Sequence, residues 1–235
     1  MIPLRDDQPT SSTPFINYFL IALNVVVFLF ELSVGMQSRG QLNALMFQFG
    51  VVPHNEIGLL TGTPVFSPGA AFVPILTAMF LHASWGHVIG NMWFLWIFGD
   101  NVEDHLGHFK YLVFYLLSGV AASFTHILLN ADSRIPSVGA SGAIAGVLGA
   151  YFILYPRARV LTWFPPFFLF YLPAWLMLGY WFVIQFVSGA ATAIAETHQT
   201  TGGVAFWAHV GGFVAGILMI KLFPERPRRS RYATW

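Results

Sequence analysis

The stretch GASGAIAGVLGAY (residues 139–151) places a single serine at the start of an otherwise apolar segment. Four glycines and four alanines make up most of the remainder, so the segment carries little side-chain bulk. Small residues let two membrane helices approach closely. Ser141, Ala145 and Gly149 fall on one helical face. The pattern therefore predicts a helix that presents a hydroxyl above a shallow groove for a second helix.

A matching face occurs in WAHVGGFVAG (residues 207–216), where His209, Gly212 and Gly216 share one side of a helix. If the two faces meet, Ser141 and His209 come close together. An imidazole within hydrogen-bonding distance of a hydroxyl can act as its general base and make the oxygen a nucleophile. The first amide groups of a helix lack intrahelical partners, so they could also stabilise an oxyanion beside the serine.

A third polar group lies in HASWGHVIGN (residues 82–91). His87 and Asn91 are four residues apart, so they project from one face of a helix. We expect their side chains to donate to the same oxyanion. His82 precedes them at the entrance of the segment, and we expect it to support this pocket or to line a path for water. Polar groups inside a membrane are costly, which makes each of them a functional candidate.

The composition is that of a lipid-embedded protein. Hydrophobic residues make up 56% of the 235-residue chain and charged residues only 9%, whereas a soluble domain carries about 25% charge. There are no cysteines, which excludes disulfides and cysteine nucleophiles. The net charge of +1 gives no indication of nucleic-acid binding, and we expect none.

Six segments have the length and apolarity of membrane spans. We expect a short N-terminal tail (1–14), a six-span domain (15–223) and a basic C-terminal tail (224–235). The loop between the first two spans is apolar enough to lie in the membrane interface. The predicted spans are Phe15–Met36, Ser84–Gly99, Phe109–Leu129, Ser141–Tyr155, Tyr171–Ala190 and Val204–Phe223.

The distribution of positive charge predicts the orientation. If the C-terminal tail is cytoplasmic, nine of the eleven Lys and Arg residues lie on the cytoplasmic side of six spans and two lie outside. Both termini are therefore expected in the cytoplasm, with Ser141 opening toward the outer face. The first residues have no signal-peptide pattern, and Asp6 and Asp7 are untypical of a transit peptide. We expect a prokaryotic plasma membrane.

These motifs resemble the rhomboid family of intramembrane serine proteases. The similarity rests on GASG, AHVGGFVAG and HASWGHVIGN, together with GDNVEDHLG (residues 99–107), and covers about residues 15–223. It implies an all-α, six-helix membrane bundle that needs no cofactor or metal. It also implies hydrolysis of a peptide bond in or near a transmembrane segment of another membrane protein, through an acyl-enzyme.

The resemblance assigns roles to individual residues. Ser141 is the expected nucleophile and His209 the base, while His87, Asn91 and the Ser141 amide form the oxyanion site. Gly139 belongs to the segment leading to the serine. Some members carry a tyrosine four residues after the serine that stacks on the histidine, and this position is Ala145 here. All ten acidic residues fall in loops or near span ends, among them Glu31 near the end of the first predicted span, so we expect a Ser–His dyad whose histidine is oriented by other contacts.

Two other functions remain open at this point. The intramembrane histidines and Asn91 could serve a transporter or metal channel, although such sites usually include carboxylate or thiolate ligands. A catalytically inactive relative that binds membrane clients is the second alternative. The sequence does not indicate an oligomeric state. Loss of activity on changing Ser141 would separate the protease from both alternatives.

Overall fold

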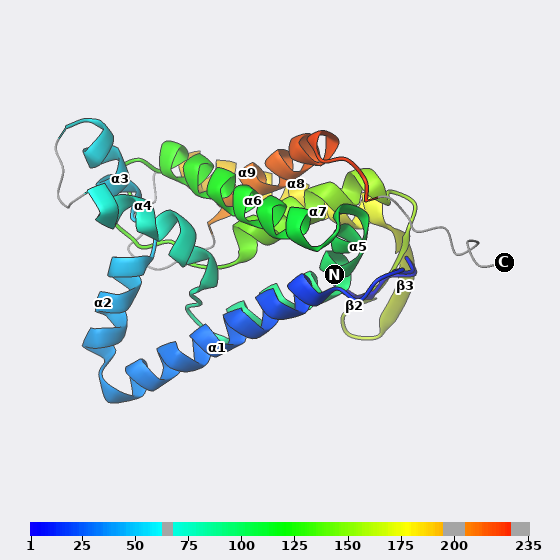
Figure 1. Cartoon of the computed structure of the whole chain (residues 1–235), viewed down its shortest axis with the longest axis horizontal. Coiled ribbons are helices and arrows are strands. Elements are labelled where there is room, and N and C mark those ends of the chain that lie inside the picture. The colour runs from blue at the N-terminus through cyan, green and yellow to red at the C-terminus, as the bar shows by residue number, and fades with distance from the viewer. Residues whose placement is uncertain (63–67, 195–204, 227–235) are drawn as a thin grey trace.

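The computed structural model describes residues 1–62, 68–194 and 205–226, which form a helical bundle with three short strands at one end (Figure 1). The strands are β1 (Ile2–Arg5), β2 (Arg159–Phe164) and β3 (Phe168–Pro173). The helices are α1 (Phe15–Gln37), α2 (Arg39–Phe49), α3 (Pro53–Leu60), α4 (Pro68–Thr77), η1 (Ala78–Phe80), α5 (Trp85–Leu106), α6 (His108–Leu129), α7 (Ser141–Leu154), α8 (Ala174–Ile194), α9 (Phe206–Met219) and η2 (Ile220–Leu222).

The central helix is α7, in which every residue from Gly142 to Tyr151 is buried. Helices α5, α6 and α9 pack around it. The contact with α9 is a backbone contact, because a Cβ atom added to Gly212 would lie 2.1 Å from the Gly142 carbonyl oxygen. One added to Gly216 would lie 2.0 Å from the Gly146 oxygen. The two small-residue faces therefore meet, as the sequence suggested.

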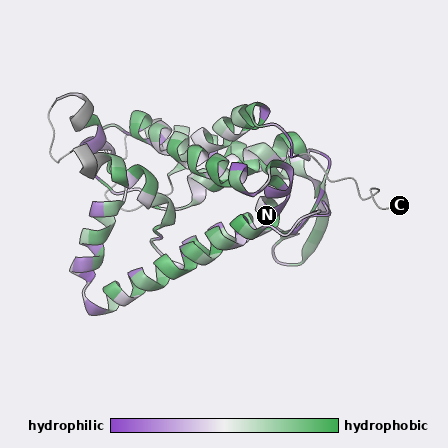
Figure 2. Cartoon of the chain, in the orientation of Figure 1, coloured by the Kyte–Doolittle hydropathy of each residue, from purple (hydrophilic) through white to green (hydrophobic). Residues whose placement is uncertain are grey.

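Within the described residues, three helices are long and apolar enough to cross a membrane: α1, α6 and α8. A fourth crossing is possible if the end of α4 with η1 and the whole of α5, bent by 84°, count as one span. The apolar helices α7 and α9 are shorter. Figure 2 shows hydrophobic residues along the bundle helices and hydrophilic ones on α2 and near helix ends. The count of six spans stays a prediction.

The all-α expectation is wrong in one region, because β1, β2 and β3 form an antiparallel sheet in that order. The segments RVLTWF and FLFYLP are rich in aromatic and branched residues, which favour strands, and they pair from Arg159↔Pro173 to Phe164↔Phe168. Helix α8 therefore begins at Ala174 rather than at the predicted Tyr171. The same sheet takes up part of the expected N-terminal tail, since Ile2 pairs with Trp163.

Helix α5 continues to Leu106, beyond the predicted Gly99, because its polar end is satisfied by other elements. The fully buried Glu103 accepts the backbone N–H groups of Ile16 at 3.0 Å and Asn17 at 2.7 Å. These are orphan donors at the start of α1 that need a partner. The Asn17 side chain then donates to the Leu95 carbonyl oxygen at 3.0 Å. This network fixes α1 against α5, the helix that carries His87 and Asn91.

The long connection between α1 and α5 contains α2, α3 and α4, and residues 63–67 lie outside the described structure. Its contact with the centre of the molecule runs through Val51, which is 2% exposed. The Val51 N–H donates to the Ser137 oxygen at 3.0 Å, and the Ser137 N–H donates back at 2.7 Å. This bridge holds the segment that leads into α7. The location of the connection in the membrane interface stays a prediction.

The α7–α9 contact leads to a stability prediction. Replacing Gly216 with alanine forces the two backbones apart, because the new methyl group meets a carbonyl oxygen that no rotamer change can move. We expect G216A to lower the midpoint of thermal unfolding in detergent by several degrees. The matched control is G90A, whose added methyl group has no atom within 4 Å and should leave the midpoint unchanged or slightly raised. Equal midpoints for the two variants would contradict the described packing.

Candidate active site

The structure brings Ser141 and His209 into direct contact. Ser141 is the first residue of α7, and His209 is the fourth residue of α9, where it is only 7% exposed. Its Nε2 atom lies 2.7 Å from the Ser141 hydroxyl oxygen. The glycine contact between α7 and α9 sets this distance, because it allows no bulk between the helices. The pair has the geometry of a hydroxyl and its general base.

His209 has a second hydrogen bond on the opposite side of its ring. Its Nδ1 atom lies 2.7 Å from the side-chain oxygen of Gln185, which is carried by α8. The Trp181 ring, one turn earlier on α8, lies 5.7 Å from the imidazole centroid with the planes tilted by 34°. The sequence left the orientation of His209 unassigned. From the sequence, Trp181 was expected only among aromatic residues that could form a side entrance from lipid. The structure shows that both α8 residues contact the histidine.

Gly139 occupies a position in the segment before Ser141 that only glycine fits. Its φ angle is +134°, a value that residues with a side chain rarely adopt, and an added Cβ would lie 2.6 Å from the His87 ring. Its N–H donates to the Ala78 carbonyl oxygen at 2.8 Å, which ties the segment to η1. The imidazole of His87 therefore lies against the backbone just before the serine.

The remaining predicted residues form a hydrogen-bonded series next to His87. The Asn91 side-chain amide donates to His82 Nε2 at 2.9 Å, and the rings of His82 and His87 meet edge to face with centroids 5.1 Å apart. The backbone N–H of His82 in turn donates to both carboxylate oxygens of Glu31 at 3.2 Å. Glu31 is 2% exposed and comes from α1. The sequence predicted Glu31 near the end of the first span and gave no indication of this contact.

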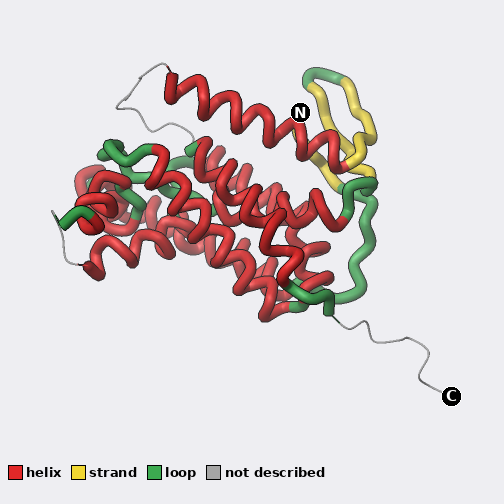
Figure 3. Tube along the Cα trace, turned by 90° about the horizontal axis from the view of Figure 1, so that it is seen from above, coloured by secondary structure: helices red, strands yellow, loops and turns green. Residues whose placement is uncertain are grey.

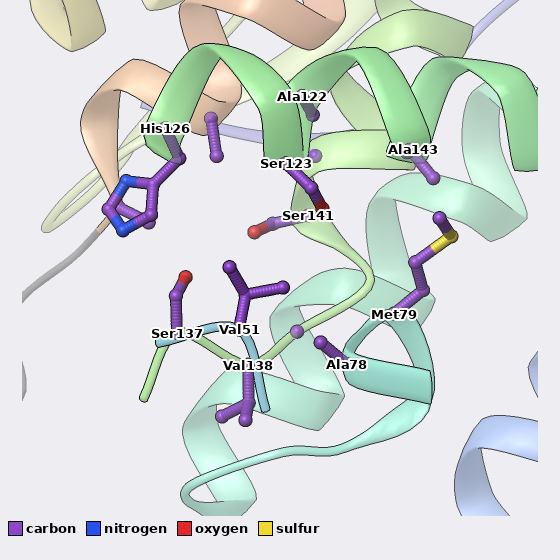
Figure 4. A pocket seen from close by; sticks show the side chains of 15 residues that line it. Val51, Ala78, Met79, Ala122, Ser123, His126, Ser137, Val138, Ser141 and Ala143 are labelled. Carbon is purple, nitrogen blue, oxygen red and sulfur yellow. The ribbon is translucent and has the colours of Figure 1, made fainter. Parts of the chain in front are cut away.

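A cavity of about 30 Å³ opens beside Ser141. Figure 4 shows the serine hydroxyl directed into the space between His126 and Ser123 of α6 and the side chain of Val51. The volume suits a small group such as a methyl or a water molecule. No sequence motif surrounds His126, so the sequence alone did not favour it as a site residue, yet it is part of the wall of this cavity.

The structure bears on two further hypotheses from the sequence. The segment 189–203 is rich in small and polar residues, which suggests a mobile cap over the site. Residues 189–194 continue α8, and 195–203 lie outside the described structure. The metal-channel alternative needs several ligands at one place. Among the described residues, the structure contains no group of three or more His, Cys, Asp or Glu side chains that could hold a metal ion.

The fold and the site together are those of a membrane-embedded protein. An apolar helical bundle holds a serine–histidine pair between two glycine-lined helices. Residues 70–226 match the family model described as the Rhomboid domain. The chain belongs to the rhomboid family.

Three relatives illustrate the similarity. Rhomboid-like protein 11, chloroplastic, of Arabidopsis thaliana is 33% identical over 68% of this chain and 55% of the relative. Rhomboid protein 1, mitochondrial, of Saccharomyces cerevisiae is 31% identical over 68% of this chain and 45% of the relative. Presenilin-associated rhomboid-like protein, mitochondrial, of Mus musculus is 31% identical over 76% of this chain and 45% of the relative.

The chain thus spans about half the length of the curated relatives it matches. Their names place those proteins in chloroplasts and mitochondria. These relatives therefore give no support to the prokaryotic plasma membrane that the sequence led us to expect. The family and the apolar helices support a location in a membrane without naming which one.

Proposed function

We propose that this protein is an intramembrane serine endopeptidase that cleaves peptide bonds in or near transmembrane segments of other membrane proteins. The observation that carries the proposal is the 2.7 Å contact between His209 Nε2 and the Ser141 hydroxyl at the mouth of a buried helix. Family membership supports it, and so does the position of the polar groups around Ser141. In this proposal, the protease domain comprises residues 15–223 and both termini lie in the cytoplasm. Its partners are the lipid bilayer and the substrate membrane proteins.

In the proposed reaction, Ser141 attacks the substrate carbonyl carbon while His209 Nε2 takes the hydroxyl proton. The negative charge on the former carbonyl oxygen is stabilised by the Ser141 backbone N–H, the His87 ring and the Asn91 amide. His209 then gives its proton to the leaving amine, which leaves an ester on Ser141. Water hydrolyses this ester with His209 again acting as base. No metal or cofactor takes part.

The arrangement of Asn91 suits this role. One N–H of its amide group donates to His82 Nε2, which leaves the second N–H to donate to the oxyanion. The amide is only 8% exposed, so its dipole acts in a poorly screened environment. His82 would act through Asn91 by holding its amide group in position. Glu31 would hold the backbone at His82.

An inactive client-binding protein is the second candidate, because names such as rhomboid-like protein do not specify an activity. It is less well supported, since a protein without catalysis has no need of a nucleophile and a base at hydrogen-bonding distance. A transporter is less well supported still, because nothing in that function requires Ser141 and His209 to be paired.

The first test removes the two reacting groups. We expect S141A and H209A each to abolish cleavage of a reporter membrane protein, because neither half of the pair can act alone. A fluorophosphonate probe should label the purified wild-type protein and not S141A. The control is S33A, which removes an exposed hydroxyl on α1 and should cleave and label normally. Full cleavage by S141A would refute the proposal, and absence of any labelling or cleavage by wild type would favour the inactive candidate.

The second test concerns the oxyanion. Replacing Asn91 with alanine removes one donor, and we expect kcat to fall by about 10²–10³-fold with little change in KM. The loss should appear in kcat because the charge on the oxygen develops only in the transition state. Steady-state cleavage of a fluorogenic membrane-peptide substrate measures both constants. An unchanged kcat would remove Asn91 from the site.

The third test concerns the cavity beside Ser141. Its volume of about 30 Å³ favours a small side chain at the cleaved position. We expect a substrate with alanine there to be cleaved at least about 10-fold more efficiently, in kcat/KM, than one with leucine. V51A enlarges the cavity and should narrow this difference. The control V26A alters an exposed side chain on α1 and should preserve it. If the wild-type protein cleaves the leucine substrate as well as the alanine substrate, the cavity does not bind the side chain at the cleaved position.

A further inference from the structure

The hydrogen bond on the far side of the His209 ring decides which nitrogen is available as the base. A neutral imidazole carries one proton, and only the nitrogen without it can accept a proton from Ser141. Gln185 presents its side-chain oxygen to Nδ1 at 2.7 Å, and an amide oxygen only accepts hydrogen bonds. The proton is therefore held on Nδ1, and the lone pair is on Nε2, 2.7 Å from the serine oxygen.

The position of Gln185 is fixed by its neighbours on α8. Trp181 and Gly189 lie one turn before and one turn after it, so the three residues form one stripe on the helix. Trp181 contacts the His209 ring and also lies 6.1 Å from the Phe213 ring. At Gly189, an added Cβ would lie 3.2 Å from Trp207. The stripe therefore packs against the first half of α9, from Trp207 to Phe213, around His209.

The opposite side of α8 faces outward. In Figure 3, α8 is the helix that leads from the strands along the outside of the bundle. Large side chains on this outer side are exposed, among them Tyr180, Val183, Phe186 and Val187, whereas Met177 and Leu178 are buried. A glutamine is an unusual choice in such an apolar helix, where an amide group is costly unless it is hydrogen-bonded. The bond to His209 gives Gln185 its partner.

We propose that Gln185 is a positioning residue for the reaction, so that the catalytic group is a Ser141–His209–Gln185 series rather than a dyad. This inference rests on the proposed protease function. The side-chain oxygen of Gln185 holds His209 in the productive tautomer and ring orientation. When Nε2 takes the serine proton, the Nδ1 proton stays on the ring and keeps its bond to the amide oxygen. Gln185 itself neither gains nor loses a proton.

The series depends on the packing of α8 against α9. The base is correctly oriented only while the stripe of Trp181, Gln185 and Gly189 stays in place. The position that some family members fill with a tyrosine is Ala145, whose buried methyl group lies next to Gly212 of α9 and provides no ring to stack on the imidazole. In this chain, the contacts that orient His209 come from α8.

The test compares Q185L, Q185E and wild type. Leucine removes the acceptor, and we expect kcat to fall by about 10–10²-fold with KM unchanged, the usual size of effect for a residue that orients a reactive imidazole. Labelling of Ser141 by the fluorophosphonate probe should slow by a similar factor. Q48L makes the same chemical change on the exposed face of α2 and should behave like wild type.

Q185E separates a positioning role from a merely structural one. The other titratable side chains that interact with His209 are the imidazoles of His87 and His126. A carboxylate at position 185 keeps the acceptor and favours the protonated ring, so the acid limb of kcat/KM against pH should move to higher pH than in wild type. This shift is expected even if Q185L is poorly folded.

The outcomes are distinct. A fall in kcat for Q185L together with the shifted acid limb for Q185E supports the series. Wild-type kcat in a folded Q185L, or an acid limb of Q185E at the wild-type position, overturns it while leaving the protease function intact. Failure of the proposed function itself would be seen in wild type, which would neither cleave the reporter nor label at Ser141.

Discussion

The backbone contact between α7 and α9 is the constraint on which the rest of this structure depends. Gly212 and Gly216 lie against carbonyl oxygens of α7 at distances that leave no room for a methyl group. In lipid, helices gain little from burying apolar surface against each other, and close packing supplies the stabilisation instead. The same approach sets the distance between Ser141 and His209, so stability and site geometry come from one interface.

Two hydrogen-bonded series complete the site. On one side, the series runs from Glu31 of α1 through His82, in the loop before α5, to Asn91 of α5. On the other side, α8 supplies Gln185 to the histidine. Each series ends at a group that would act in the reaction, and each begins in a helix that contributes no reacting atom. A site of this kind is held in shape by hydrogen bonds that are strong because they are buried.

The sequence predicted the parts of the fold that leave a periodic pattern. The small faces of α7 and α9 follow from residue spacing, and α1 and α6 were located to within a residue or two. The sheet was missed because FLFYLP is as apolar as a membrane span, and only pairing partners from distant segments make it a strand. Gln185 was visible as a polar residue in an apolar helix, but its partner depends on how α8 rotates against α9. Local sequence carries no such information.

The interior of α7 has a consequence for engineering. Its residues from Gly142 to Ala150 are glycine, alanine and a few aliphatic side chains, all buried against the backbone or side chains of neighbouring helices. A library that varied this helix to alter selectivity would mostly yield unfolded protein. The cavity wall contributed by other elements, including Val51 and His126, offers positions where new shapes can be introduced without touching the helix contact. Substrate selectivity can therefore be altered at the cavity wall while the packing of α7 is left unchanged.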